Sequence, residues 1–261
     1  MRQRRGGVKN LACREEGGIA WITLCRPKVR NALSRVLVDE LDKALGTLER
    51  ARGVKALILC GEGDFAAGAD ITEMADATPE EAMAFSFSPV FNRLAAFPLP
   101  TIAAIDGYAL GGGLELALAC DIRIAARTAR LGLPEITLGI MPGAGGTARL
   151  PKTIGLSRAL AMIYTGEILS GEQALALGLV DRLAEDSARA EAEILAAKIA
   201  KGSRTALSAA KKAVLSGWRE ADIDRAAEQE MSRWAALFAS YDQKEGMRAF
   251  LERRSLVFED R

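Results

Sequence analysis

Short apolar runs alternate with helical patterns through the first half of this sequence, and this alternation constrains the fold most. Residues 18–25 and 55–60 are apolar runs rich in Ile, Leu and Ala, and a helical pattern over residues 34–53 separates them. The pattern continues as a helix over 80–97, a strand over 101–105, a helix over 113–120 and a strand over 122–126. Strands that alternate with helices predict an α/β fold with a largely parallel sheet.

Beyond residue 185 the pattern becomes wholly helical. Residues 186–201, 203–217, 222–240 and 243–254 show helical spacing, and no strand candidate follows. We expect the charged side chains of these helices to face solvent. The predicted division is a core over residues 1–195 that carries the functional site, followed by a helical region over residues 196–261.

The residue types present exclude several classes of chemistry. The absence of histidine excludes Ser-His-Asp and Cys-His catalysis, the common zinc sites and the 2-His-1-carboxylate iron site. Proton transfer must then fall to carboxylates, Lys, Tyr or Cys. The four cysteines form no CxxC pair, so we expect reduced thiols and no metal site. A net charge of +1 gives no reason to expect a nucleic-acid partner.

The sequence also bears on location. The basic residues 1–10 lack the apolar stretch of a secretory signal, and no run approaches the roughly 18 apolar residues of a membrane span. We therefore expect a soluble, cytoplasmic protein without a membrane partner. A mature organellar matrix protein is the alternative, because such a chain no longer carries its targeting peptide.

Two glutamates stand out near the middle of the chain. Glu115 lies in an apolar run directly after three glycines, and a carboxylate there is costly to bury unless it is paired or hydrogen-bonded. Glu135 follows 20 residues later, enough for a helix, a turn and a strand to return the chain to the same end of the sheet. Two carboxyl groups in one apolar cleft would divide into an ionised base and a protonated acid. A capping or surface role for Glu135, after Pro134, is the alternative.

Two loops of small residues are candidates for an oxyanion hole. Residues 65–71 carry small side chains that allow a ligand to approach the backbone, and the glycines at 111–113 precede an apolar helix. Free N–H groups at that helix start would point out of the turn, and two such loops could aim donors at one oxygen. Ordinary strand-to-helix turns are the alternative. Residues 63–68 and 143–148 fail as phosphate-binding motifs, because the first lacks the following Lys-Ser/Thr and the second follows Pro142.

Four segments of the sequence closely resemble the crotonase (enoyl-CoA hydratase/isomerase) superfamily: residues 66–71, 105–117, 134–139 and 142–147. The resemblance extends from about residue 19 to residue 182, and more loosely to the C-terminus. It implies the ClpP-like crotonase spiral of repeated ββα units. It also implies that the C-terminal helices form a trimerisation region, in a homo-oligomer that is a trimer or a dimer of trimers (a hexamer).

The same resemblance implies an activity and the groups that perform it. Hydratases of the family are carbon-oxygen lyases of the EC 4.2.1 type, which add water reversibly and in syn geometry across the double bond of a 2-trans-enoyl-CoA in fatty acid β-oxidation. By position, Glu115 would orient and deprotonate the water, and Glu135 would exchange the proton at C2. The N–H groups of Ala69 and Gly112 would hold the oxygen of the thioester enolate. The resemblance implies no cofactor beyond the coenzyme A of the substrate, and no metal.

Substrate contacts are implied at further positions. Arg26, Lys28 and Arg30 match positions that hold the CoA pantetheine and adenine, with an exposed basic loop as the alternative. The other candidate substrate contacts lie in the two glycine loops or near the acyl chain: Ala67, Gly68, Asp70, Ile71, Gly111 and Met141. Apolar residues that either line the acyl pocket or belong to the core are Met74, Phe85, Phe87, Phe91 and Met141. Thr72, where many hydratases have lysine, and a tail without their proline at residues 252–256 leave the CoA contacts open.

Several functions stay open within and outside the family. Residues 111–121 are also similar to methylglutaconyl-CoA hydratases, whose acyl group is acidic. Enoyl-CoA isomerases commonly use one acid/base group, at the position of Glu135, so the presence of both glutamates favours a hydratase. RNA binding, seen in some relatives, is disfavoured because residues 34–52 carry as many acidic as basic side chains. An inactive scaffold is disfavoured because both glutamates and both loops are present.

Overall fold

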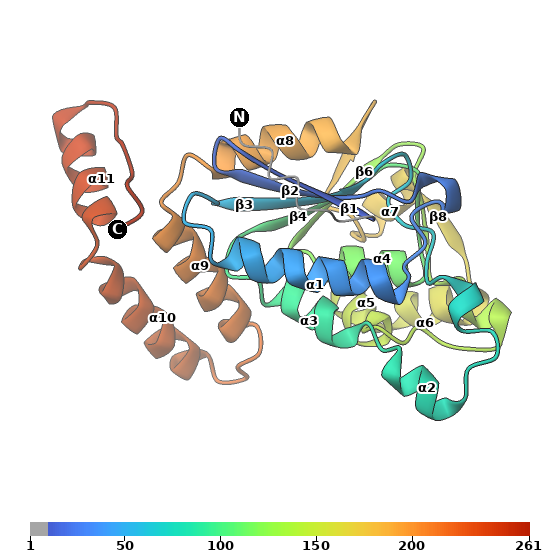
Figure 1. Cartoon of the computed structure of the whole chain (residues 1–261). Coiled ribbons are helices and arrows are strands. Elements are labelled where there is room, and N and C mark those ends of the chain that lie inside the picture. The colour runs from blue at the N-terminus through green and yellow to red at the C-terminus, as the bar shows by residue number, and fades with distance from the viewer. Residues whose placement is uncertain (1–9) are drawn as a thin grey trace.

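The computed structural model describes residues 10–261 and contains two sheets (Figure 1). The six-stranded sheet runs in the order β1 (Leu11–Glu16), β2 (Ile19–Leu24), β3 (Ala56–Gly61), β4 (Thr101–Ile105), β6 (Ile122–Ala126) and β9 (Arg182–Ala184). The three-stranded sheet runs in the order β5 (Tyr108–Leu110), β7 (Arg130–Gly132) and β8 (Ile168–Ser170). All neighbours are parallel except β1 with β2 and β7 with β8. The predicted largely parallel sheet is confirmed.

The chain builds these sheets by repeating a strand-strand-helix unit. β4 in the large sheet leads to β5 in the small sheet and then to α4 (Gly112–Leu118). β6 leads in the same way to β7 and the 3₁₀ helix η3 (Pro134–Leu138). Since β5 and β7 are parallel neighbours, α4 and η3 both begin at the same edge of the small sheet. The repeated ββα unit therefore places the first residues of α4 and η3 close to each other.

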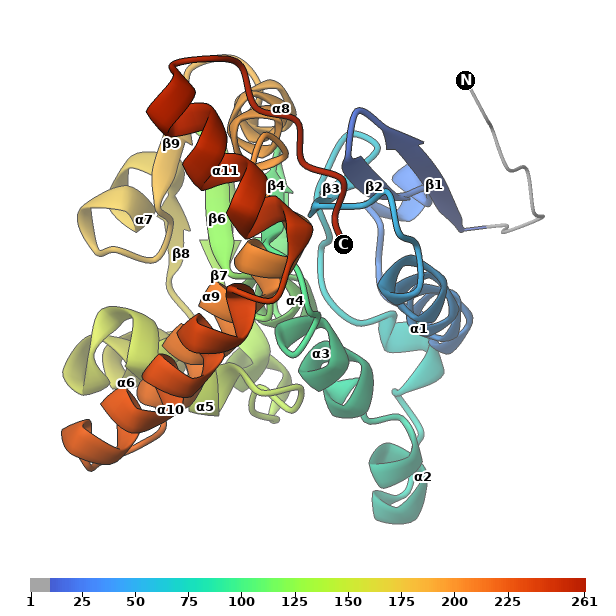
Figure 2. The same ribbon diagram turned by 90° about the vertical axis from the view of Figure 1, so that its left-hand side faces the viewer.

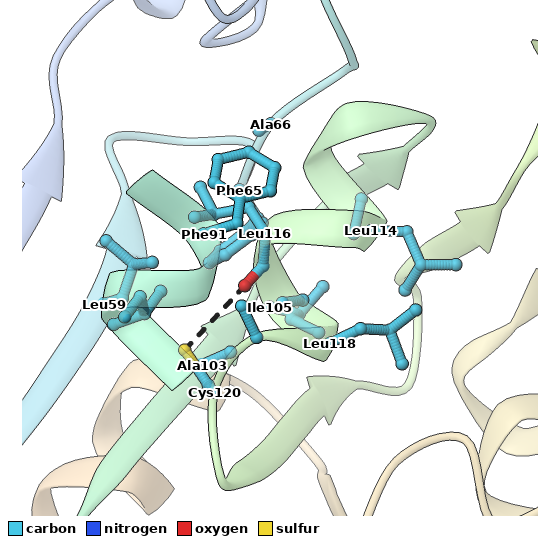
Figure 3. Close-up of a cluster of buried hydrophobic side chains, with 14 of the residues drawn as sticks. Leu59, Phe65, Ala66, Phe91, Ala103, Ile105, Leu114, Leu116, Leu118 and Cys120 are labelled. Carbon is cyan, nitrogen blue, oxygen red and sulfur yellow. Dashed lines mark hydrogen bonds between the residues drawn. The ribbon is translucent and has the colours of Figure 1, made fainter. Parts of the chain in front are cut away.

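Successive side chains of each strand in the large sheet point to opposite faces, so the core is divided between the two faces of this sheet. On one face, leucines and alanines of the strands pack against α1 (Arg35–Glu49), α3 (Ser88–Ala95) and α4. On the other face, Ile58 and Cys60 pack with the alanines of α8 (Ala188–Ile199), which is the only described helix in that cluster. Figure 1 shows these helices on opposite sides of the sheet. Figure 3 shows Leu116 of α4 among the first group, near Phe65 and Phe91.

One helix prediction was wrong. Residues 80–97 form two helices, α2 (Pro79–Ala84) and α3, rather than one. Pro89 lies in the first turn of α3, where its missing N–H costs nothing, whereas a continuous helix would need that N–H to reach the carbonyl four residues earlier. β1 was not predicted, since only its Leu11 is buried. The three-residue strands β5, β7, β8 and β9 were not predicted either, because they are too short to show a period.

The C-terminal residues are helical, as predicted. α9 (Arg204–Gly217), α10 (Ile223–Leu237) and α11 (Tyr241–Glu252) lie to one side of the sheets (Figures 1 and 2). The nearly buried Lys211 of α9 joins them to the sheets through an ion pair of 2.7 Å with Asp121 and a bond to the Leu99 carbonyl. The division at residue 195 stays a prediction. No described helix is long and apolar enough to cross a bilayer, and all four cysteines are free thiols.

The remaining elements are two 3₁₀ helices, which follow β2 and β3, and three α-helices, which lie between η3 and β9. They are η1 (Pro27–Val29), η2 (Ile71–Glu73), α5 (Gly146–Ile154), α6 (Leu156–Thr165) and α7 (Gly171–Ala176). Of these, α5 packs against α4, and α6 packs against α5 and η3. α5 therefore covers part of α4, and α6 lies beside η3, whose residues 136–138 stay exposed.

Candidate active site

The two glutamates lie on the helices that follow the parallel strands β5 and β7. Glu115 is on α4, every residue of which is buried, and its exposed fraction is 3%. Glu135 is in the first turn of η3, with an exposed fraction of 9%. The charge of Glu115 contributes to a raised pKa at Glu135, so the two carboxyl groups interact. The expectation that 20 residues return the chain to one end of a sheet is thus met in the three-stranded sheet.

Glu115 is held by two backbone donors. Its Oε1 accepts hydrogen bonds from the N–H of Ala144 at 2.8 Å and of Gly146 at 2.7 Å. A Cβ at Gly146 would lie 2.9 Å from Oε1, so this close approach requires glycine. Burial raises the pKa of Glu115, while the two N–H donors and the charge of Arg149 act to lower it. The donors and this charge offset part of the effect of burial, so the carboxylate is less disfavoured than burial alone would make it, although the pKa of Glu115 stays above its ordinary value.

Glu135 has a different environment. Its Oε2 is buried and finds no hydrogen-bond partner among residues 10–261. Burial raises its pKa to about 7, the charge of Glu115 adds to this, and a backbone hydrogen bond acts against it. Gly111 lies against this side chain: a Cβ there would be 3.2 Å from Oε1, and its φ of 52° with ψ of −127° is accessible only to glycine. Near neutral pH, Glu135 therefore readily holds a proton, whereas the ionised form of Glu115 receives two hydrogen bonds.

The two glycine loops meet beside these glutamates. A Cβ at Gly112 would lie 3.6 Å from the backbone nitrogen of Ala69, which measures how close the loops are. Gly112 is the first residue of α4, so its N–H has no partner within the helix. Within the described chain, neither this N–H nor that of Ala69 donates to another residue. Two backbone donors from different loops are therefore available at one place.

The loop that carries Ala69 is fastened by residues predicted to contact substrate. Arg26 forms an ion pair of 3.0 Å with Asp70 and also donates to the Ala32 carbonyl. A hydrogen bond from Thr72 and the Arg26 guanidinium hold the pKa of Asp70 below its usual range, against the effect of burial. Leu33 donates to the Gly68 carbonyl at 2.8 Å, which adds a backbone link. Arg26 and Asp70 thus join two loops, and their contact with substrate stays a prediction.

The other predicted contacts differ in exposure. Lys28 and Arg30 are exposed, and the Arg30 guanidinium lies 4.7 Å from the ring centroid of Tyr108. Ala67 is half-buried, Gly68 is buried with φ of 115°, and Ile71 is exposed. Among the candidate pocket walls, Phe91 is a core residue, Met141 is 68% exposed, and Met74, Phe85 and Phe87 are half-buried. The interpretation of Phe91 as core is confirmed.

The segment that holds Glu115 was not predicted from the sequence. From the sequence, residues 143–146 were interpreted as a failed phosphate loop and as part of a segment that resembles the crotonase superfamily, whereas the structure shows that Ala144 and Gly146 donate to Glu115. The available signal was a buried carboxylate that needs donors and a glycine-rich turn that offers them. Arg149, which the sequence analysis did not consider, follows on α5 and donates to the Ala144 carbonyl at 3.1 Å.

Comparison with known proteins gives consistent matches over nearly the whole chain. Residues 14–261 match the family described as enoyl-CoA hydratase/isomerase. The short-chain-enoyl-CoA hydratase of Clostridium acetobutylicum is 40% identical over 95% of this chain and 97% of its own length. The crotonyl-CoA hydratase of Syntrophomonas wolfei is 39% identical over 96% of this chain and 98% of its own length. A crystal structure of an enoyl-CoA hydratase subunit I from Geobacillus kaustophilus superposes with a TM-score of 0.91 at 42% identity, covering 97% of this chain and 98% of that one.

Proposed function

The chain belongs to the enoyl-CoA hydratase/isomerase family, with the crotonase fold of that family, and we propose that it is an enoyl-CoA hydratase. The reaction is the reversible syn addition of water to a 2-trans-enoyl-CoA, which makes the enzyme a carbon-oxygen lyase of the EC 4.2.1 type. One observation carries the proposal: two buried carboxyl groups follow neighbouring parallel strands beside two unpaired backbone donors.

In this proposal the N–H groups of Ala69 and Gly112 form the oxyanion hole. Addition of water at C3 moves charge onto the thioester oxygen, which becomes an enolate oxygen before C2 takes a proton. Donors fixed by backbone need no reorganisation as the charge develops, and losing one such donor typically costs on the order of 10²–10³ in rate. The position of Gly112 at the start of α4 adds the positive end of the helix dipole, although α4 is short.

The two glutamates take different parts. Glu115, with two N–H donors on one oxygen, is the base that orients and deprotonates the water. Glu135, whose pKa is raised to about 7, delivers a proton to C2 and recovers it in the reverse direction. After addition, Glu115 holds the proton taken from water and Glu135 is ionised, so return of that proton from Glu115 to Glu135, directly or through solvent, restores the starting state and balances the reaction.

The proposal also covers the CoA contacts, the pathway, the location and the assembly of the enzyme. The exposed Lys28 and Arg30 contact the phosphates or adenine of CoA, and Arg26 acts mainly through Asp70. No metal or cofactor beyond the CoA of the substrate takes part. Within the described residues, no cluster of His, Cys, Asp or Glu is arranged to hold a metal ion. The enzyme acts in short-chain β-oxidation in the cytoplasm, as a homo-oligomer whose assembly uses α9, α10 and α11.

A substrate panel tests the activity. Loss of enoyl absorbance is followed with short, medium, branched and carboxylated 2-enoyl-CoAs, in the presence and absence of EDTA. We expect hydration of the short acyl chains, no effect of EDTA, and a loss of at least about 10³-fold in kcat for both Glu115→Gln and Glu135→Gln.

The same panel separates the alternatives. Preference for the carboxylated, branched substrate would make the protein a methylglutaconyl-CoA hydratase. If the wild type hydrates none of the panel but moves a 3-enoyl double bond, and only Glu135→Gln abolishes this, the protein is an isomerase and the hydratase proposal is wrong.

A further inference from the structure

The loop over residues 143–146 contains three successive peptide groups. Each of them forms a hydrogen bond to a side chain outside the loop. In the first peptide, the Gly143 carbonyl accepts from the Ser88 hydroxyl at 3.2 Å, while the Ala144 N–H of the same peptide donates to Glu115 at 2.8 Å. A donor on the carbonyl oxygen polarises the peptide, which strengthens the bond that its N–H makes. The hydroxyl of Ser88 thus acts on Glu115 through a single peptide group.

The middle peptide is held by Arg149. Its Nη1 donates to the Ala144 carbonyl at 3.1 Å, and its Nη2 donates to the Asn92 side chain at 2.5 Å. Gly145 has a φ of 103°, and a Cβ there would overlap the guanidinium, so glycine allows Arg149 to lie on the loop. The third peptide then donates its Gly146 N–H to Glu115. Arg149 therefore fixes the peptide that separates the two donors.

The outer anchor of this arrangement is α3. Ser88 and Asn92 are four residues apart and thus lie on one face of that helix. The helix itself is fixed by the fully buried Phe91 and Leu94. The loop is in this way tied to a core helix from a different part of the chain.

Arg149 also acts by its charge. The charged groups that face Glu115 within the described chain are Arg149 from α5 and Glu135 from η3. Arg149 favours the carboxylate of Glu115, and an ionised Glu135 disfavours it. Arg149 is half-buried, so its charge is only partly screened by water.

We propose that Arg149, anchored by Asn92 of α3 and assisted by Ser88, is a positioning residue that holds the loop over residues 143–146 so that Glu115 stays ionised and correctly oriented. This inference rests on the proposed function for its kinetic consequences. It concerns residues that contact neither substrate nor reacting atoms in that mechanism, and it adds a link between α3 and the base.

The test uses the full chain with Arg149→Met, Arg149→Lys and Asn92→Ala, and Arg52→Met as the matched control. Arg52 is exposed in the turn after α1 and is remote from the loop in sequence. We expect Arg149→Met to lower kcat roughly 10- to 100-fold, with KM changed less than about threefold. Its acid limb of kcat/KM moves to higher pH, because the pKa of Glu115 rises when the cation is lost.

The other variants separate charge from geometry. Arg149→Lys keeps the charge but cannot bind Ala144 and Asn92 together, so we expect an acid limb close to that of the wild type with a reduced kcat. Asn92→Ala, near the surface, should lower kcat by less than Arg149→Met, and Arg52→Met should match the wild type. An Arg149→Met variant with an unchanged pH profile, whether active or uniformly weakened, would show a structural role only and overturn the proposal.

A second readout does not depend on activity. The carboxyl infrared band of Glu115, assigned by its absence in Glu115→Gln, is titrated in the wild type and in Arg149→Met. The proposal requires the midpoint to rise in Arg149→Met and not in Arg52→Met. If the wild type hydrates no enoyl-CoA, the proposed function fails while this titration still decides the role of Arg149.

Discussion

At the scale of single residues, the site keeps two carboxyl groups in unlike environments a short distance apart. Glu115 receives two backbone N–H donors, whereas the Oε2 of Glu135 has no partner among residues 10–261. A buried carboxyl without a partner favours its protonated form, so its pKa rises to about 7 from an ordinary value of 4.5. This asymmetry assigns the proton to Glu135 and has a consequence for stability.

The folded protein binds the proton of Glu135 more tightly than the unfolded chain does. Between about pH 4.5 and 7, stability therefore falls as pH rises, by about 3 kcal/mol in total from this residue. We expect Glu135→Gln to raise the melting temperature clearly at about pH 8 and little at about pH 5. The exposed Glu167→Gln is the control and should show no such pH dependence. Equal effects of Glu135→Gln at both pH values would contradict this account.

At the scale of elements, the backbone of α4 packs directly on the backbone of the loop over residues 65–71, which glycine makes possible. Gly113 of α4 packs on Ala66, where a Cβ would overlap the Ala66 carbonyl oxygen. That carbonyl is fixed because it accepts from the Leu110 N–H at 3.0 Å, and Ala66 donates to the Tyr108 carbonyl. α4 can therefore approach the loop over residues 65–71 only with glycine at this position, and this approach brings Gly112 close to Ala69.

Gly113→Ala tests this packing. Alanine favours a helix over glycine by about 1 kcal/mol, so a surface helix would gain stability from the change. Here we expect a net loss of about 1–3 kcal/mol and a loss of activity, because neither backbone can move without breaking strand bonds. Urea denaturation with Gly53→Ala as control checks it, since a Cβ at Gly53 meets nothing within 4 Å. A Gly113→Ala variant as stable and active as the wild type would refute the packing argument.

At the scale of the whole molecule, the C-terminal helices bury little of their apolar surface within the chain. No residue of α9 or α10 is fully buried, and large apolar side chains are exposed on all three helices and directly after α9, among them Val214, Trp218, Ile223, Trp234 and Phe250. Exposed apolar surface of this extent is typical of interfaces between subunits. In the proposed trimer or hexamer, other copies of the chain would cover these apolar side chains.

Light scattering tests the assembly directly. We expect a particle of three or six chains of 27.8 kDa each, because the apolar faces of α9–α11 need a partner. Trp234→Glu, which places a charge on the exposed face of α10, should reduce the mass towards that of one chain. A wild-type protein that stays monomeric at micromolar concentration would contradict the proposal.

Local pattern and residue type were enough to predict the alternation of strands and helices, the family, and the two glutamates with their glycine loops. The break between α2 and α3 was also encoded locally, in Pro89, but was not recognised. The groups that surround each glutamate could not be predicted in this way, because they come together through packing. Ala144 and Gly146 reach Glu115 from about 30 residues away, and Arg149 reaches Asn92 across 57 residues. Contacts of this kind depend on how elements pack, and packing leaves no period in the sequence.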